Sequence, residues 1–301
     1  MEKKLKQIDL YRTSLINVDP EESETNGEVQ TSRVVYNSVG NEIERISYTG
    51  DGEVDERVVI AWQNGKPVEE ILEMAGEVAE RTTHEYDENS RLLREFRHYL
   101  DGDPDQISFE YDNDGHMILR QLTDSDGEKG EKQVWIYQNG KLSREELWNE
   151  YGDLENSKTF TYAEDGSPEE TVELIFAGGE QTRLVTQYDE EGNISAEKRY
   201  DARGRLVSRQ VLTQGENGRT ALIEEETVTG KTLIKLEYDD AGNNILHQET
   251  TADGEPLTLI QRSFDQEGQI MNVEVRMENL PNRPGQHYRL RYAYSYYDSE
   301  A

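Results

Sequence analysis

The 301-residue chain contains no cysteine, which excludes disulfides, thiol nucleophiles, thiolate zinc sites and iron–sulfur ligation together. It also lacks any run approaching the roughly 18 consecutive apolar residues of a membrane-spanning helix, so no membrane insertion is expected. The first residues, MEKKLKQIDLYRTS, are basic but have no apolar segment behind them. A secretion signal is therefore not expected, and a cytoplasmic location is predicted.

Positive charge is also scarce. The chain has 32 Lys and Arg against 64 Asp and Glu, a formal net charge of −32, with only 33% hydrophobic residues. Such a composition borders on that of disordered chains, but 17 Tyr and 3 Trp are typical of a folded protein. The acid excess disfavours direct binding to nucleic acid. It serves either to keep the protein soluble or to attract a basic protein partner.

One aromatic residue recurs directly before a turn at intervals of 24 to 26 residues, with a single interval of 50. The long interval indicates two periods with one aromatic missing near position 213. Glycines mark the turns, so the pattern predicts a hairpin repeat of about 25 residues. We call the aromatic residues anchors; they are Tyr36, Trp62, Tyr86, Tyr111, Tyr137, Tyr162, Tyr188, Tyr238 and Phe264. The turn glycines are Gly40, Gly65, Gly115, Gly140, Gly166, Gly192, Gly204, Gly242 and Gly268.

The turns and the segments between them have distinct chemistry. Asn-Gly in WQNG and YQNG predicts two-residue type I′ turns, and Y-D-x-x-G predicts type I turns closed by a left-handed glycine. Apolar residues alternate with polar ones before the anchors, as at Val58, Ile60 and Trp62. This alternation predicts antiparallel strands with one apolar and one charged face. A short helix is expected only in residues 3–16.

These patterns predict an all-β fold with about 20 strands in one long antiparallel meander from residue 32 to residue 297. Because strand twist accumulates, a flat sheet of this width is not expected. We expect an elongated solenoid-like or spiral single sheet, curled around its own apolar face. Composition divides the chain into an N-terminal arm or cap with an acidic linker (1–31), a β-hairpin repeat domain (32–277) and a Tyr/Arg-rich capping strand (278–301).

The last segment contains a local cluster of positive charge on this otherwise acidic chain. It is interpreted either as a closing strand that protects the end of the sheet or as a partner-binding patch, since Tyr and Arg dominate interface hot spots. This C-terminal cluster consists of Tyr288, Arg289, Arg291, Tyr292 and Tyr294.

Two stretches resemble known bacterial repeats. IYQNGKLSREELW at 136–148 resembles the MORN-variant repeat, whose core is an aromatic, a spacer, Asn-Gly-Lys, an aliphatic residue and Glu. YDEEGNISAEKRYDARGRLVSRQ at 188–210 resembles the YD repeat of RHS-type proteins, through its Tyr-Asp pairs and glycines. The resemblance, over residues 33–277, implies antiparallel hairpins in a curled sheet. It also implies a link to toxin–antitoxin pairs or to shells that enclose toxins, although this chain is too short for a complete shell.

Several acidic turns are candidate calcium-binding loops. Carboxylates at alternate positions are typical of calcium-binding loops, but hairpin turns require the same residue types. No cofactor is expected, with Ca²⁺ as the one alternative. The candidate loops contain Asp101, Asp103 and Asp105; Asp112 and Asp114; and Asp124, Asp126 and Glu128.

Catalytic signals are absent from the sequence. The five histidines form no metal-ligand pair at helical spacing, and no nucleophile elbow, P-loop or dinucleotide motif occurs. We therefore predict a non-enzymatic acidic repeat scaffold that binds a protein partner, most plausibly a basic one, in a toxin-neutralising or adaptor role. The alternatives are a Ca²⁺-stabilised surface or injection-associated module, and a polymer-acting hydrolase that uses two of the carboxylates. The histidines are His84, His98, His116, His247 and His287.

Overall fold

The computed structural model describes residues 4–15, 27–99, 102–215, 218–281 and 283–298. These residues form 22 antiparallel β-strands that follow one another as a meander. The described part of the chain holds no helical segment that could serve as a membrane span. The strands are β1 (Leu5–Ser14), β2 (Val29–Tyr36), β3 (Glu42–Tyr48), β4 (Val54–Gln63), β5 (Lys66–Met74), β6 (Glu77–Tyr86), β7 (Leu92–His98), β8 (Asp105–Tyr111), β9 (Met117–Thr123), β10 (Lys129–Gln138), β11 (Lys141–Trp148), β12 (Leu154–Tyr162), β13 (Pro168–Ala177), β14 (Glu180–Tyr188), β15 (Ile194–Tyr200), β16 (Leu206–Gln214), β17 (Thr220–Thr227), β18 (Gly230–Tyr238), β19 (Asn244–Thr251), β20 (Pro256–Phe264), β21 (Ile270–Met277) and β22 (Gln286–Tyr296).

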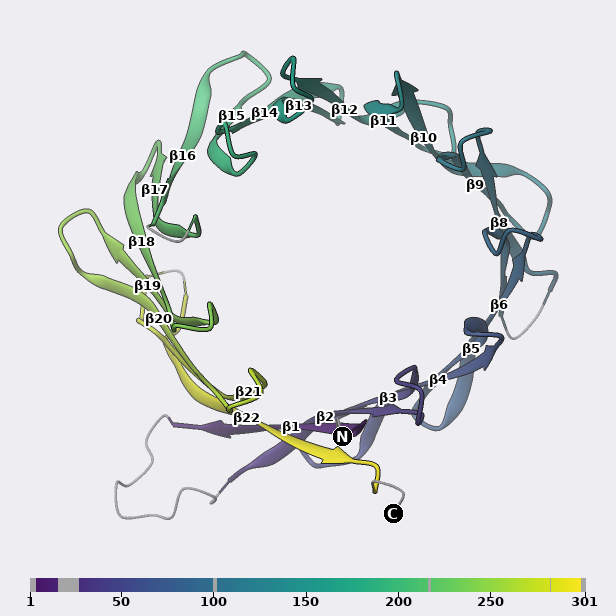
Figure 1. Cartoon of the computed structure of the whole chain (residues 1–301), viewed down its shortest axis with the longest axis horizontal. Coiled ribbons are helices and arrows are strands. Elements are labelled where there is room, and N and C mark those ends of the chain that lie inside the picture. The colour runs from purple at the N-terminus through teal and green to yellow at the C-terminus, as the bar shows by residue number, and fades with distance from the viewer. Residues whose placement is uncertain (1–3, 16–26, 100–101, 216–217, 282, 299–301) are drawn as a thin grey trace.

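The sheet closes into a barrel, which appears as a ring in Figure 1. Strand β1 lies between β2 and β22 and pairs antiparallel with both. The predicted solenoid or open spiral is therefore wrong. The sheet does curve as expected, but its two ends meet, and closure pairs the backbone groups that an open sheet would leave at its edges.

The closing strand comes from the segment for which a short helix was expected, and that prediction is also wrong. Ile8 and Leu10 share one face of β1, while Asp9 and Tyr11 share the other, which is strand periodicity. Pairing with a neighbour on each side outweighs the weak local preference of such a short segment. The same sheet thus runs through all three segments that composition distinguishes.

Turns lie at two rims of the barrel. The anchor rim carries the turns that follow the anchors, together with both described chain ends, where the Tyr297 N–H donates to the Lys4 carbonyl (2.9 Å). The distal rim carries the turns half a repeat away. The turn predictions are confirmed: both Asn-Gly pairs have two positive φ angles, 52° and 76°, and all nine turn glycines have φ between 74° and 93°.

The register assigns every strand residue to one of two faces, because cross-strand partners share a face and successive residues alternate. All anchors lie on one face, which we call the anchor face. Of the six buried apolar residues in the described part of the chain, Ile107, Val273 and Val275 are on the anchor face, and Ile46, Val185 and Ala196 are on the opposite face. The expectation of one apolar and one charged face is therefore wrong.

The barrel wall is a single layer of sheet. Its accessible surface is 19638 Å², whereas a compact protein of 34.7 kDa exposes about 13,000 Å². Barrels with far fewer strands already have interiors too wide for side chains to fill. Apolar burial is consequently spread along both faces as contacts between neighbouring strands, and most strand residues remain half-exposed.

Candidate functional surfaces

Each anchor is the last or second-last residue of a strand at the anchor rim. Five of the nine reach back over the preceding strand, where the polar tip donates to a backbone carbonyl of the first or second residue. These bonds tie neighbouring strands together at the anchor rim. They run from Trp62 Nε1 to Glu42 (2.7 Å), and from the hydroxyls of Tyr86 to Pro67 (2.8 Å), Tyr111 to Leu92 (2.9 Å), Tyr162 to Leu142 (2.8 Å) and Tyr238 to Thr220 (3.0 Å).

The missing anchor near position 213 is replaced by Gln214, which ends β16 at the equivalent place. Its side-chain Nε2 donates to the carbonyl of Ile194, the first residue of β15 (3.4 Å). The repeat thus retains its hydrogen bond at this position but loses the aromatic ring.

The sequence analysis did not identify a second recurring residue of the repeat. The residue directly after the turn covers the ring of the next anchor, 19 to 21 positions later in the chain. Cations over aromatic faces contribute about 0.5–1 kcal/mol at exposed sites. These cations lie against the rings, whereas exposed residues of the neighbouring turns, such as Glu88 and Glu164, carry negative charge. The contacts are Lys66 on Tyr86 (4.6 Å), Arg91 on Tyr111 (4.8 Å), Lys141 on Tyr162 (4.9 Å), Arg219 on Tyr238 (5.8 Å) and the His116 ring stacked on Tyr137 (4.5 Å).

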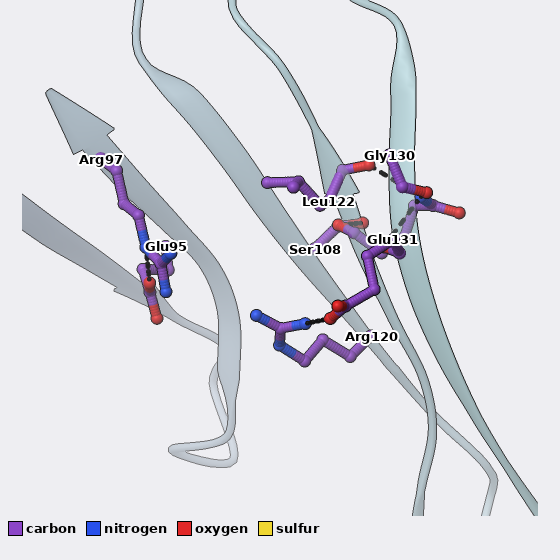
Figure 2. Close-up of polar contacts among 8 residues, drawn as sticks. Glu95, Arg97, Ser108, Arg120, Leu122, Gly130 and Glu131 are labelled. Carbon is purple, nitrogen blue, oxygen red and sulfur yellow. Dashed lines mark hydrogen bonds and ion pairs between the residues drawn. The ribbon is translucent and has the colours of Figure 1, made fainter. Parts of the chain in front are cut away.

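The wall itself is nearly neutral. The 22 strands contain 25 Lys and Arg against 29 Asp and Glu, a net charge of −4. Many of these residues pair within the sheet, as Figure 2 shows for Arg97 with Glu95 (2.8 Å) and Arg120 with Glu131 (3.1 Å). Outside the strands, 7 Lys and Arg stand against 35 Asp and Glu, a net charge of −28. The acid excess therefore belongs to turns, connections and chain ends.

Part of this acid holds the turns together. In Asp87, Asp201 and Asp239, one carboxylate oxygen accepts the backbone N–H four residues later (2.8 Å, 2.9 Å and 2.8 Å). These bonds lower the pKa of each carboxyl: the backbone bond from Arg91 is the main cause at Asp87, and side-chain bonds from Arg205 and Asn243 at the other two. Asn37 and Asn149 make the same backbone bond without charge.

We expect these carboxylates to make the fold acid-sensitive. Because their pKa is lower in the folded state, their contribution to stability is complete above the unfolded-state pKa of about 3.9 and is lost as pH falls through the folded-state pKa. In the variant Asp87→Asn/Asp201→Asn/Asp239→Asn, the acceptor oxygen remains but does not titrate. Thermal melts between about pH 5 and pH 3 should show a shallower fall of Tm for this variant than for the wild type. Parallel curves would contradict the assignment.

The candidate calcium loops are built the same way. Asp112 accepts the N–H groups of Asp114 (3.0 Å) and His116 (2.9 Å), and its second oxygen lies 3.0 Å from His116 Nδ1. One ligand atom from each of these three residues lies within 4.8 Å of the others. Asp124 likewise accepts the N–H groups of Asp126 (3.0 Å) and Glu128 (2.8 Å). These bonds support the turn interpretation, and calcium binding stays a prediction.

Of the third candidate loop, Asp101 lies outside the described residues. Asp105 accepts the N–H of Ser125 in the neighbouring distal-rim turn (3.0 Å). Its carboxylate therefore links two turns. Asp103 is exposed in the turn before β8.

The C-terminal cluster lies in β22, beside the closing strand. Arg291 donates two hydrogen bonds to Glu28 (2.8 and 2.7 Å), which lowers the pKa of that carboxyl, and its guanidinium covers the Tyr11 ring (4.3 Å). Arg289 lies 3.6 Å from Glu274, and the Tyr294 hydroxyl donates to Ile270 (2.8 Å). Tyr288 and Tyr292 are half-buried in the same strand. These contacts serve the seam of the barrel, and partner binding by this cluster stays a prediction.

The histidines are spread over the sheet. Four lie in strands, and His116 directly follows a turn. His84 Nε2 is 4.0 Å from Glu95, and His287 Nε2 is 2.8 Å from Glu274. His98 contacts Thr83 (3.3 Å), and burial lowers the pKa of His247.

These features define a closed, single-layer barrel of tandem β-hairpins with acidic rims. No family model matches the sequence, and no curated protein matches it. The crystal structure of TcdB2-TccC3 without its hypervariable C-terminal region is similar over 90% of this chain and 16% of its own, with 12% identity and a TM-score of 0.34. TcdB2-TccC3-TEV is similar over 82% and 15%, with 12% identity and a TM-score of 0.34. This chain thus spans about one sixth of those chains. A porin-like protein from Bacteroides uniformis ATCC 8492 is similar over 98% and 99%, with 10% identity and a TM-score of 0.36.

Proposed function

We propose that this protein is a non-enzymatic scaffold that binds a basic protein partner through its acidic rims. The observation that carries the proposal is the charge partition, −28 outside the strands against −4 within them. A concentration of one charge sign attracts an oppositely charged partner and speeds its encounter. A toxin-neutralising or adaptor role suits such a partner. The cytoplasmic location stays a prediction.

Six acidic side chains of the anchor rim allow a direct test. They are exposed and occupy the second or third position of their turns, so they set the charge of the rim without accepting the hydrogen bonds that hold the turns. The six are Glu88, Glu164, Glu190, Glu191, Asp240 and Glu267.

We expect the variant that changes all six to Gln or Asn to bind a fluorescently labelled poly-lysine peptide at least about tenfold more weakly than the wild type at low salt. Its affinity should also depend less on NaCl concentration. Fluorescence anisotropy titrations at two salt concentrations measure both effects. If wild-type protein does not bind the peptide, the proposed function is wrong.

A matched control removes the same number of negative charges from the wall. It carries six Glu→Gln changes within strands and should bind like the wild type if the rim is the site. Equal weakening of both variants would mean that net charge alone matters, which contradicts a rim site. The control positions are Glu56, Glu110, Glu155, Glu169, Glu225 and Glu249.

The two alternative functions gain less support. Glu169 and Glu170 border a cavity of about 510 Å³ together with Tyr188 and Ser195. As successive strand residues they point to opposite faces, so they do not converge on one bond as a hydrolase requires. The calcium alternative has the turn carboxylates described above, and these already accept turn hydrogen bonds.

We also infer that the hairpins are of the MORN-variant and YD types. The double positive φ at Asn139 and Gly140 supports the first, since Asn-Gly-Lys is central to that repeat. The Tyr188-Asp189 unit supports the second, because Asp189 accepts the N–H of Asn193 (2.7 Å) and thereby closes the turn after the tyrosine.

A further inference from the structure

Tyr188 lacks both contacts that recur among the anchors. Its ring is half-buried, and among the described residues no cation covers it and no group bonds to its hydroxyl. The residue directly after the preceding turn is Ser167, which carries no charge. This unit of the repeat therefore has neither the hydroxyl bond nor the covering cation.

Strand β13 places a carboxylate beside this anchor. Glu170 pairs with Gln187 across β13 and β14. One residue closer to the anchor rim, Glu169 lies beside Tyr188 on the anchor face, since cross-strand neighbours share a face. The register of β11 and β12 places Lys141 beside its own anchor in the same way. Glu169 thus occupies the position that a cation occupies in other units.

The same register accounts for the free hydroxyl of Tyr188. The Tyr162 hydroxyl donates to Leu142, which lies outside the ladder that β11 forms with β12. The equivalent residue on β13 is Glu170, which already belongs to the ladder with β14. At this unit the anchor rim therefore presents a ring, a hydroxyl and a carboxylate side by side.

The other anchors without a covering cation are built differently. Trp62 donates its ring N–H to the carbonyl of Glu42 (2.7 Å), and Phe264 has no polar tip. Tyr36 also has a carboxylate beside it, that of Glu42 on β3, but Arg45 pairs with this carboxylate (2.7 Å). In these units the chain satisfies its own polar groups.

The cations near Glu169 are engaged elsewhere. The Lys141 ammonium lies over its own anchor ring (4.9 Å) and donates to the Gly166 carbonyl (2.8 Å). Lys198 donates to Gln187 (2.9 Å) on the face opposite the anchors. Within the described part of the chain, Glu169 has no ion pair and no hydrogen bond, and its side chain is exposed.

A cavity of about 510 Å³ lies at this place on the anchor rim, bordered by both Glu169 and Tyr188. The comparable cavity at Tyr86 has about 290 Å³ and is bordered by Lys66, the cation over that ring. The face of an aromatic ring carries negative potential, as a carboxylate does, so the two together attract a cation. The unit therefore favours a cation that this chain does not supply.

We propose that Glu169 and Tyr188 bind a lysine side chain of the basic partner. The lysine ammonium lies over the Tyr188 ring and pairs with the Glu169 carboxylate, and the hydroxyls of Thr161 and Ser195 at the border of the cavity offer further acceptors. The inference rests on the proposed function, because it names the group of the basic partner that one unit of the anchor rim recognises.

Carbodiimide crosslinking with N-acetyl-lysine amide, followed by peptide mapping with mass spectrometry, tests the proposal. The reagent joins a carboxylate to an amine that contacts it, and this probe has a single amine. We expect the yield at Glu169 to exceed that at Glu110 at least about threefold, because Glu110 is an exposed carboxylate near the same rim without an anchor ring beside it. In the variant Tyr188→Leu the ratio of the two yields should fall to about one.

Two results would overturn the proposal: equal yields at the two carboxylates in the wild type, or an unchanged ratio in Tyr188→Leu. The proposed function is decided separately, by whether the wild type binds poly-lysine at all. Poly-lysine contacts the rims through many lysines at once, so its affinity does not report on Glu169, which is one of the six wall control positions.

The variant Glu169→Lys provides a second test that needs no ligand. It places an ammonium beside the Tyr188 ring, as Lys141 does at its own anchor. Its Tm should lie about 1–2 °C above that of Glu110→Lys, which makes the same change of charge opposite Leu119. An equal or lower Tm would show that a cation at this position gains nothing from the ring, which contradicts the proposal.

Discussion

Replacement of Tyr162 by alanine should lower the free energy of unfolding by about 3 kcal/mol, the lower end of the range for large aromatic residues because the ring is only half-buried. Three interactions are lost together: the ring contacts at the anchor rim, the hydroxyl bond to Leu142 (2.8 Å) and the Lys141 ammonium over the ring (4.9 Å). Urea denaturation followed by circular dichroism measures the change.

Tyr162→Phe is the matched control for this prediction. It keeps the ring and the Lys141 contact and removes only the hydrogen bond, so the expected loss is about 1 kcal/mol. The chain itself uses both solutions, since Phe264 is an anchor without a hydroxyl and Gln214 keeps the hydrogen bond without a ring. Equal losses for Ala and Phe would mean that the ring contributes nothing, which would contradict its role as an anchor.

Deletion of residues 1–15 should have the largest effect of all. The deletion removes β1, so β2 and β22 become free edges more than 250 residues apart in sequence. It also breaks the ion pair of Arg33 with Asp9 (2.7 Å). Exposed edges recruit other strands, so we expect larger assemblies or aggregates than the full-length protein forms, and a loss of cooperative melting.

Size-exclusion chromatography with light scattering and a thermal melt test this expectation. Deletion of residues 1–3, which precede β1, is the control and should leave both measurements unchanged. The wild-type assembly size and Tm after deletion of residues 1–15 would show that closure contributes no stability, and the barrel would then behave as an open sheet.

The candidate surfaces differ in how far sequence could reveal them. The acidic rims follow from composition together with the turn positions, both visible in the sequence. Residues 198–209 contain five Lys and Arg, but their composition does not reveal which face each occupies. Only the register shows that Arg199 points to the anchor face while Lys198 and Arg209 lie on the other, with Glu226 opposite Arg209. The C-terminal arginines, in contrast, are engaged with Glu28 and Glu274.

The hairpins, their turns and the anchors could be predicted from the sequence, because each depends on residues close together in the chain. Asn-Gly pairs and turn aspartates dictate backbone conformation over four or five residues. Closure of the barrel depends instead on contacts between distant parts of the chain. Strand β1 and strand β22 are far apart in sequence, and the ten residues of β1 have little preference of their own. Their conformation follows from two neighbouring strands that meet only when the whole meander has curved through a full turn.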